Sequence, residues 1–184
     1  MDNGVLFRPA SLKQEMFINS TAFRTIYGGS MGGGKTFMGL MRFLLYVDDP
    51  NFIGFVIRKN ASDLRGAGGA YDEALAMFSK YDPKLKYTKQ PMQMTFSSGA
   101  KIFFTGLDGD AGMKSLQGKQ ISAIMLDEAT HFTEEEIVWA ESRLRTKADM
   151  IPNIWLTCNP DKSSVIFQWK IGRASCRERV SSPV

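Results

Sequence analysis

The sequence predicts an α/β fold in which a mainly parallel sheet is flanked by helices. Short apolar runs alternate with amphipathic helical stretches, which is the pattern of strand–helix–strand units. The run FIGFVI, residues 52–57, has no polar alternation, as expected for a strand that is covered on both faces. The 184 residues are 43% hydrophobic and 23% charged, which suits about one folded domain and excludes a disordered or collagen-like chain.

Apolar spacing places the other main elements. Buried strands are expected at residues 21–27, 52–57, 121–126 and 154–158, and helices at residues 36–47, 70–80 and 133–145. The last helix has a clear start, because the Thr133 hydroxyl and the Glu136 carboxylate can satisfy N–H groups that have no partner within the helix. No internal domain boundary or repeat divides these elements.

The segment between the second and third buried strands has its own pattern. Residues 86–96 and 100–105 are expected to form two strands of a hairpin, with residues 97–99 as the turn. Residues 106–118 are rich in glycine and are expected to form a mobile loop with a short helix.

The C-terminus carries part of the basic character of the chain. The formal net charge is +4, and residues 171–184 contain three arginines and one glutamate, so residues 1–170 keep a net charge of +2. The run IGRASCRERV, residues 171–180, resembles the translated read-through of a sequencing adapter. We therefore expect a native domain at residues 1–170, incomplete at its C-terminus, and a non-native tail at residues 171–184. The alternative is a genuine basic arm that contacts nucleic acid.

Composition also bears on the cellular compartment. Cys158 and Cys176 form no disulfide framework and suit a reducing cytoplasm. The N-terminus MDNGVLFRPASLKQE lacks the pattern of a signal peptide. No run approaches the roughly 18 consecutive apolar residues that span a bilayer, so no membrane association is expected.

The strongest motif is a full match to G-x-x-x-x-G-K-[ST], made by Gly29, Ser30, Met31, Gly32, Gly33, Gly34, Lys35 and Thr36. It lies between an apolar strand and an amphipathic helix, the context that a phosphate-binding loop requires. Backbone N–H groups and the helix N-terminus would surround the phosphates of ATP. Lys35 would reach the β- and γ-phosphates, and the Thr36 hydroxyl would coordinate Mg²⁺. The alternative is a glycine-rich turn that happens to precede Lys-Thr.

Two carboxylates follow the third buried strand, in the run IMLDE. Asp127 and Glu128 would lie at the carboxyl edge of the sheet, where ligands of open α/β sheets bind. Asp127 would hold Mg²⁺ directly or through water. Glu128 would orient and deprotonate the attacking water, which indicates a hydrolase more than a kinase. The alternative is an acidic strand end that begins the next turn.

A third polar strand end lies in the run LTCNP. Thr157 and Asn159 are expected beside the Asp–Glu edge, within reach of the γ-phosphate. An ordinary strand-to-turn transition explains the spacing equally well, because Asn-Pro is a common turn pair.

The three motifs together resemble a known family. YGGSMGGGKT, then IMLDEATHFTEEE with RLR after it, then LTCNP are similar to the ATPase domain of the large terminase subunit of tailed bacteriophages. The resemblance covers residues 12–169. It implies a P-loop ATPase of the additional-strand, catalytic-glutamate type, with an extra strand between the phosphate-loop strand and the Asp–Glu strand. It implies ATP hydrolysis, with ATP and Mg²⁺ as cofactors, that drives double-stranded viral DNA into an empty procapsid.

The resemblance also implies partners and a location. These are the portal protein and the small terminase subunit, a homo-oligomeric ring of the full-length protein, and the host bacterial cytoplasm with transient binding to the procapsid. The family's second domain, a metal-dependent nuclease, has no counterpart in this sequence. A chain without further ATPase-domain residues is expected to bind Mg²⁺-ATP weakly and to hydrolyse it slowly or not at all.

Further roles come only from the resemblance. By position it assigns Gln14 to the adenine, Thr157, Cys158 and Asn159 to the motif that couples the γ-phosphate to DNA movement, and Arg58 and Arg65 to an arginine-rich segment. Either arginine is a candidate for stabilising the γ-phosphate in the transition state, Arg58 within its own chain and Arg65 across to a neighbour. The family often carries an arginine early in the loop, where Ser30 and Met31 stand here.

Two other functions remain open at this point. The first is a superfamily-2 helicase, because Asp127, Glu128 and Ala129 resemble the helicase box, although LTCNP differs from the usual helicase strand end. The second is an inactive fragment that only binds nucleotide or partner subunits.

Two minor features have simple interpretations. The run KYDPKLKYTKQ, residues 80–90, interleaves lysines with Tyr81 and Tyr87, which fits either a surface that follows DNA or, more simply, a solvated strand edge. His131 is the only histidine and is expected to make a local hydrogen bond.

Overall fold

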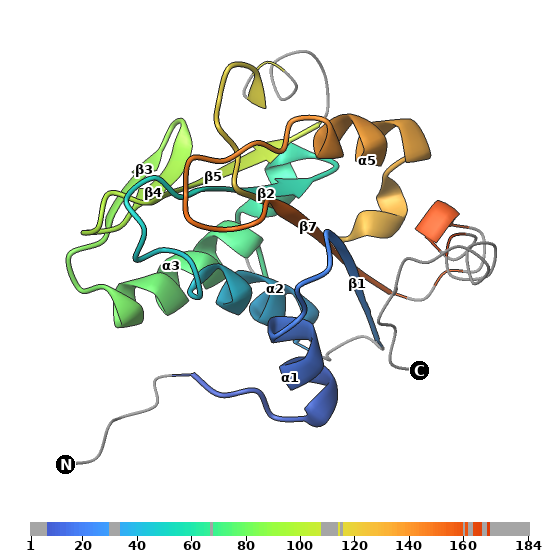
Figure 1. The fold of residues 1–184 in the computed structure, drawn as a ribbon, viewed down its shortest axis with the longest axis horizontal. Helices are drawn as coiled ribbons and strands as arrows, with labels where there is room; N and C mark the ends of the chain where they lie inside the picture. The colour runs from blue at the N-terminus through green and yellow to red at the C-terminus, as the bar shows by residue number, and fades with distance from the viewer. Residues whose placement is uncertain are drawn as a thin grey trace.

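The computed structural model describes residues 7–29, 34–66, 68–107, 114, 116–159, 161, 164–166 and 169 (Figure 1). Its helices are α1 (Leu12–Ile18), α2 (Lys35–Phe43), α3 (Ala70–Tyr81) and α5 (Glu134–Glu141), with the short 3-10 helices η1 (Ala61–Leu64) and η2 (Ala129–His131). Its strands are β1 (Arg24–Gly28), β2 (Ile53–Arg58), β3 (Lys86–Lys89), β4 (Met92–Thr95), β5 (Lys101–Gly106), β6 (Ala123–Leu126) and β7 (Asn153–Cys158). Among the described residues, every helix is too short or too polar to cross a membrane.

The strands form one mixed sheet in the order β1-β7-β6-β2-β5-β4-β3. The first five of these strands are parallel neighbours, and β4 and β3 continue the sheet in antiparallel pairing. β7 lies between β1, which leads into the glycine-rich motif, and β6, which leads into the Asp–Glu pair. This order confirms the predicted additional strand, and it brings the carboxyl ends of four parallel strands to one edge.

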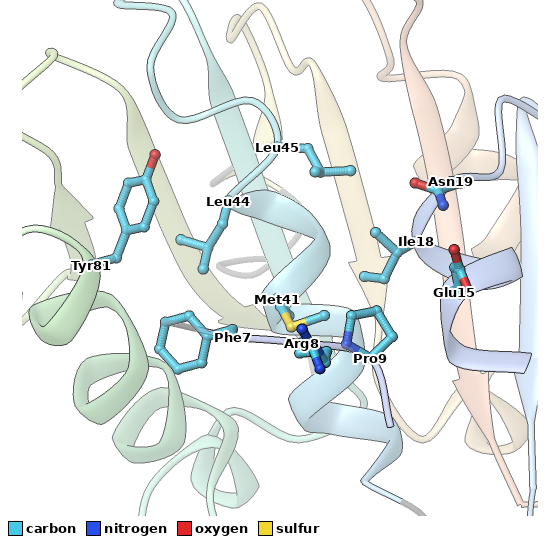
Figure 2. A pocket seen from close by; sticks show the side chains of 10 residues that line it. All are labelled: Phe7, Arg8, Pro9, Glu15, Ile18, Asn19, Met41, Leu44, Leu45 and Tyr81. Atoms are coloured by element: carbon cyan, nitrogen blue, oxygen red, sulfur yellow. The ribbon is translucent and has the colours of Figure 1, made fainter. Parts of the chain in front are cut away.

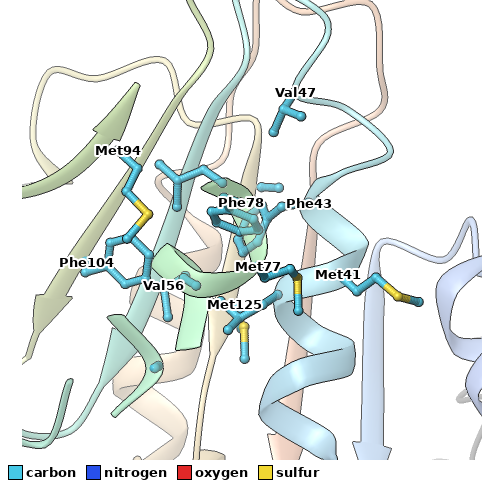
Figure 3. Close-up of a cluster of buried hydrophobic side chains, with 14 of the residues drawn as sticks. Met41, Phe43, Val47, Val56, Met77, Phe78, Met94, Phe104 and Met125 are labelled. Carbon is cyan, nitrogen blue, oxygen red and sulfur yellow. The ribbon is translucent and has the colours of Figure 1, made fainter. Parts of the chain in front are cut away.

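The helices α1, α2 and α3 cover one face of the sheet (Figure 1). Figure 3 shows the core on this side, where Phe43, Phe78 and Met125 lie among other buried side chains. The ring of Phe43 packs 4.6 Å from the ring of Trp155, which is fully buried. Burying a side chain of this size contributes about 1.5–3 kcal/mol, so this face supplies much of the stability that positions α2.

A second core lies on the opposite face, under α5. Buried residues of the parallel strands pack there against Ile137 and Trp169. The Trp169 indole donates a hydrogen bond to Glu134 at 3.1 Å and lies 4.3 Å from the guanidinium of Arg24. Arg24 in turn donates twice to Glu141 of α5. Trp169 is therefore part of the packed domain.

The predicted single strand at residues 86–96 is wrong. It is two antiparallel strands, β3 and β4, that turn at Gln90 and Pro91. Pro91 has no N–H to donate, so it suits a turn better than the middle of a ladder. The predicted turn at residues 97–99 is confirmed, since Gly99 adopts φ +105° and Phe96 N–H donates to Ala100 at 2.9 Å.

The predicted helix lengths also need correction. The helix expected at residues 36–47 ends at Phe43, and the one expected at residues 133–145 ends at Glu141. After Phe43 the chain continues in tight turns with bonds between residues three apart, which keeps apolar side chains against the core without a regular helix. The helix α1 was not predicted, because only Phe17 and Ile18 of its seven residues are buried. Most of the loop expected at residues 106–118 lies outside the described residues.

Gly39 sets how closely α2 approaches the sheet. A Cβ atom at this position would lie 2.5 Å from Met125 Cε and 3.2 Å from Thr157 Cγ2. The Gly39 carbonyl accepts a hydrogen bond from the Trp155 indole at 3.1 Å. The missing side chain therefore lets α2 lie directly on β6 and β7, and this fixes its N-terminus at the carboxyl edge of the sheet.

We expect Gly39→Val to lower the free energy of unfolding by about 1–3 kcal/mol, because the added methyls force Met125 or the backbone of α2 to move. Urea denaturation measures the change. Ala76→Val on the exposed side of α3 is the control, since it places the same β-branched residue in a helix without the clash and its loss reflects helix propensity alone. Equal losses in the two variants would contradict close packing at Gly39.

Candidate active site

Polar side chains from distant parts of the chain meet at the carboxyl edge of the parallel sheet. β6 leads into Asp127, β2 ends in Arg58, and β7 carries Thr157 next to its last residue. Thr36 lies in the first turn of α2, which begins at the same edge. Because parallel strands end together, the fold brings these four residues to one place.

Asp127 lies at the centre of this group, and its side chain is 1% exposed. The Thr36 hydroxyl donates to it, 3.0 Å from Oδ1 and 3.2 Å from Oδ2. The Thr157 hydroxyl donates to Oδ1, and Arg58 donates to Oδ2 from Nε at 2.8 Å and from Nη2 at 2.7 Å. These donors compensate for the burial of a carboxylate, which is otherwise very costly.

The guanidinium of Arg58 links β2 to three neighbours. Besides its contacts with Asp127, Nη1 donates to the Asp63 carbonyl at 2.7 Å, and Nη2 lies 3.6 Å from Glu128 Oε1. The residue is 8% exposed. Arg58 is thus held inside its own chain, beside both carboxylates of the Asp–Glu pair.

Glu128 differs from Asp127 in its backbone and in its exposure. It adopts φ 55° and ψ 47°, the left-handed region, and among the described residues other than glycine it alone has a positive φ. Its side chain is 45% exposed, and His131 Nδ1 lies 3.7 Å from Oε2. This conformation costs about 1 kcal/mol or more, and it leaves the carboxylate partly exposed while Oε1 still lies 3.6 Å from Arg58 Nη2. At 3.7 Å the contact between His131 and Glu128 is too long for a hydrogen bond, so the local hydrogen bond expected for the His131 side chain is not seen among the described residues.

Glu73 is a third carboxylate near this group, and sequence reasoning missed it. It lies half-buried in the first turn of α3. Burial raises the pKa of Glu73 above its usual value, the negative charge of Asp127 raises it further, and Arg58 opposes both effects. The sequence held one signal, because Glu73 stands three residues after Ala70 and four before Met77, on the buried side of the helix.

The glycine-rich motif is described only at its ends. Gly29 N–H donates to the Cys158 carbonyl at 3.4 Å, and Gly34 adopts φ +63°, a conformation that favours glycine. Lys35 begins α2 directly after it. Ser30, Met31, Gly32 and Gly33 lie outside the described residues. Gly29 and Gly34 themselves lie at the carboxyl edge, next to the end of β1 and the start of the nine-residue helix α2.

Three other predicted residues lie around this group without joining it. Gln14, in the first turn of α1, accepts from Ala10 N–H at 2.6 Å and hydrogen-bonds Tyr27 near the end of β1. Arg65 is exposed, with its guanidinium 6.0 Å from the Tyr71 ring. Asn159 is exposed just beyond β7. Their roles remain predictions.

Comparison with models of protein families identifies the family of this chain. Residues 26–178 match the model described as terminase large subunit, T4likevirus-type, N-terminal. The chain belongs to this family. The matched range ends inside residues 171–184, so the non-native origin of that tail remains a prediction. A comparison with curated protein sequences gave no significant match.

Solved terminase structures share the fold. The large terminase of a thermophilic bacteriophage superposes with a TM-score of 0.66 at 17% identity, over 83% of this chain and 40% of its own. The ATPase domain of the Thermus phage P74-26 large terminase gives 0.58 at 13% identity, over 84% and 66%. The N-terminal domain of the bacteriophage phi29 DNA packaging ATPase gives 0.58 at 14% identity, over 91% and 86%. This chain therefore spans 40% of the length of the thermophilic phage terminase. That terminase has also been determined in complexes with ADP and ATP-γ-S.

The pH dependence of stability tests the surroundings of Glu73. Because its folded-state pKa is raised, its contribution to stability is fully present below the unfolded-state pKa and is lost as the pH rises through the folded value. We expect Glu73→Gln to unfold at higher urea concentration than the original chain at pH 7, and to lose this advantage below pH about 4, where the glutamate is protonated in both states.

Glu135→Gln is the control of opposite sign. Hydrogen bonds from its own backbone and from Thr133 lower the pKa of Glu135, so its contribution is present at neutral pH and is lost as the pH falls. The glutamine variant is expected to be less stable than the original chain at pH 7. The same sign of change in both variants would contradict the described environment of Glu73.

Proposed function

We propose that this domain binds Mg²⁺ and ATP at the carboxyl edge of its sheet and hydrolyses ATP as the motor of a viral DNA-packaging terminase. The contact between Thr36 and Asp127 carries this proposal. It joins the start of the phosphate-loop helix to the acidic end of β6, two segments 91 residues apart. If the first motif were only a glycine-rich turn and the second only an acidic strand end, nothing would require them to contact each other.

The phosphates would bind at the N-terminus of α2. Gly29 and Gly34 frame the loop, and the nine residues of α2 add the partial positive charge of a helix N-terminus. Lys35, the first residue of α2, supplies a full charge for the β- and γ-phosphates. The nucleotide complexes of the thermophilic phage relative support this assignment, as does the position of Gln14 next to β1 for the adenine.

Thr36 and Asp127 fit a magnesium ion. Because the Thr36 hydroxyl donates its proton to Asp127, the lone pairs of Thr36 stay available to a cation, and both residues offer the hard oxygen ligands that Mg²⁺ prefers. In the part of the chain that the structure describes, no group of three or more acidic, histidine or cysteine side chains forms a protein cage for a metal. That suits Mg²⁺, which keeps waters and phosphate oxygens as ligands. When bound, the ion would neutralise charge on the phosphates.

Glu128 is the candidate general base. Its carboxylate is the exposed member of the Asp–Glu pair, and it lies 3.6 Å from the guanidinium of Arg58. It would accept the proton of the attacking water, while Asp127 remains tied by its donors. The two neighbouring carboxylates thus have environments that separate their roles.

We propose that the movement of DNA requires a full-length terminase. By family membership, the proposed partners are double-stranded viral DNA, the portal protein and the small terminase subunit, and the motor would act as a homo-oligomeric ring on the procapsid in the host cytoplasm. Family membership favours this function over the superfamily-2 helicase. Measurement of ATP binding and hydrolysis by the original chain tests the inactive-fragment alternative.

Lys35→Ala and Glu128→Gln are expected to separate binding from hydrolysis. Lys35→Ala loses Mg²⁺-ATP binding because the phosphates lose a full charge. Glu128→Gln keeps binding and slows single-turnover hydrolysis by about 10²–10⁴, because only the base is removed. Titration with a fluorescent ATP analogue and quench-flow measure the two steps, and Lys80→Ala and Glu135→Gln are controls at exposed sites. Equal hydrolysis by the original chain and Glu128→Gln would rule out this role, and binding without measurable hydrolysis by the original chain would favour the inactive fragment.

Arg58 and Arg65 are proposed to stabilise charge on the γ-phosphate, Arg58 in its own chain and Arg65 in a neighbour. Arg58→Ala is expected to slow hydrolysis and also to lower the free energy of unfolding by about 3 kcal/mol, because Asp127 stays buried without its cation. Arg65 is exposed, so Arg65→Ala is expected to change the free energy of unfolding by less than about 0.5 kcal/mol. Its effect is expected only on ATP turnover by the ring. Turnover within a few-fold of the original in both variants would contradict the proposal.

A further inference from the structure

A short stretch outside the active site, between Asp82 and Asp108, contains basic residues and no acidic ones. Residues 83–107 contain four lysines, Lys84, Lys86, Lys89 and Lys101, and no aspartate or glutamate. Their charge of +4 equals the formal net charge of all 184 residues. This stretch forms β3, β4 and β5, the end of the sheet farthest from β1.

The strand register gathers polar side chains on one face of these strands. Lys86 pairs with Thr95, which pairs with Lys101, and two positions further along Thr88 pairs with Gln93, which pairs with Phe103. Because side chains alternate along a strand, all six point to the same face. Phe103 stacks on Phe55 of the second core, so this is the face opposite α3. We call it the lysine face.

The positive charge of the lysine face is not balanced by acidic residues on the strands that form it. Lys86 and Lys101 are exposed, and among the described residues neither forms an ion pair. Lys119 borders this face, with its Nζ 4.9 Å from the Phe103 ring. The Arg145 guanidinium donates to the main-chain carbonyl of Lys119 at 3.3 Å. No described residue of β3, β4 or β5 is acidic.

Protection of a sheet edge does not explain this arrangement. Lysines on an edge strand discourage pairing with other chains, and that reason suffices for β3. Lys101 lies on β5, which is paired on both sides by β4 and β2. Its exposed charge therefore has no role in protecting an edge.

The tyrosines of the segment lie elsewhere. Tyr87 alternates with Lys86 and so lies on the α3 face, where it interacts with Tyr71. The Tyr81 hydroxyl donates to Asp48 at 3.0 Å. The aromatic ring that the described strands place on the lysine face, Phe103, is half-buried against Phe55, so these strands offer no open platform for unstacked bases and suit a phosphate backbone.

We propose that the lysine face binds the phosphate backbone of double-stranded DNA. Lysine and hydroxyl side chains are the groups that contact DNA phosphates without reading sequence. The inference rests on the proposed function, in which this family moves duplex DNA. Lys101 begins β5 and Gly106 ends it, so the row of Lys86 and Lys101 lies about 17 Å along the strand from the catalytic edge, and DNA there does not obstruct the nucleotide.

The experiment compares two double variants of the full 184-residue chain that remove the same charge. Lys86→Ala with Lys101→Ala changes the lysine face, and Lys13→Ala with Lys80→Ala changes exposed positions on α1 and α3. Fluorescence anisotropy measures binding of a 30-base-pair duplex of arbitrary sequence between 50 and 200 mM salt. Because the first variant removes two lysines that face phosphates, the slope of log K against log salt is expected to fall in magnitude by about 1.8 in that variant and to stay unchanged in the second.

Binding of a fluorescent ATP analogue is measured on the same samples and is expected to be unchanged in both variants. An equal loss of DNA binding in the two variants would overturn the proposal, since net charge alone would then explain it. Tighter binding of a single strand than of the duplex, or no duplex binding by the original chain, would also overturn it while leaving the ATP site intact. Duplex binding that depends on the lysine face without any ATP binding would instead contradict the proposed function and leave this surface standing.

Discussion

The buried carboxylate of Asp127 is the interaction on which the active site depends. It is 1% exposed and accepts hydrogen bonds from α2, β2 and β7 through Thr36, Arg58 and Thr157. Hydrogen bonds to a charged group contribute about 1.5–3 kcal/mol each, so together they offset the cost of burying the charge. The same contacts fix the start of the phosphate-loop helix relative to three strands, which means that the site is formed before any ligand binds.

The two neighbouring acidic residues also differ in their surroundings, which is the basis of the separate roles proposed for them. Asp127 is held by fixed donors and keeps its orientation, whereas Glu128 follows it in a left-handed conformation with an exposed carboxylate. The groove lined by Phe7, Met41, Leu44 and Tyr81, with a volume of about 630 Å³, lies instead at the C-terminal ends of α2 and α3 (Figure 2). This groove is separate from the proposed active site at the sheet edge, where Thr36, Arg58 and Thr157 converge on Asp127.

Much of this was predictable from local sequence signals. Local patterns predicted local structures: the apolar run before Asp127 forms β6, and the capping box at Thr133 begins α5. The glycine-rich motif correctly predicted the start of α2 at its end. The additional strand between β1 and β6 was predicted only from the family resemblance, and the rest of the sheet order was not predicted. Features that depend on packing were missed. The helix α1 was not predicted because it buries just two residues, and the end of α2 at Phe43 was missed because its apolar pattern continues in turns. Residues 86–96 were predicted as one strand, which Pro91 divides into two. Glu73 reaches the site only through the placement of α3, which no local pattern specifies.

The most direct test is an experimental structure of this chain bound to Mg²⁺ and ATP-γ-S. A preformed site predicts that Thr36, Arg58 and Thr157 keep their hydrogen bonds to Asp127, and that the metal lies beside Thr36 and Asp127 with the phosphates at the N-terminus of α2. A metal bound away from both residues, or a nucleotide complex in which the donors have left Asp127, would contradict the account.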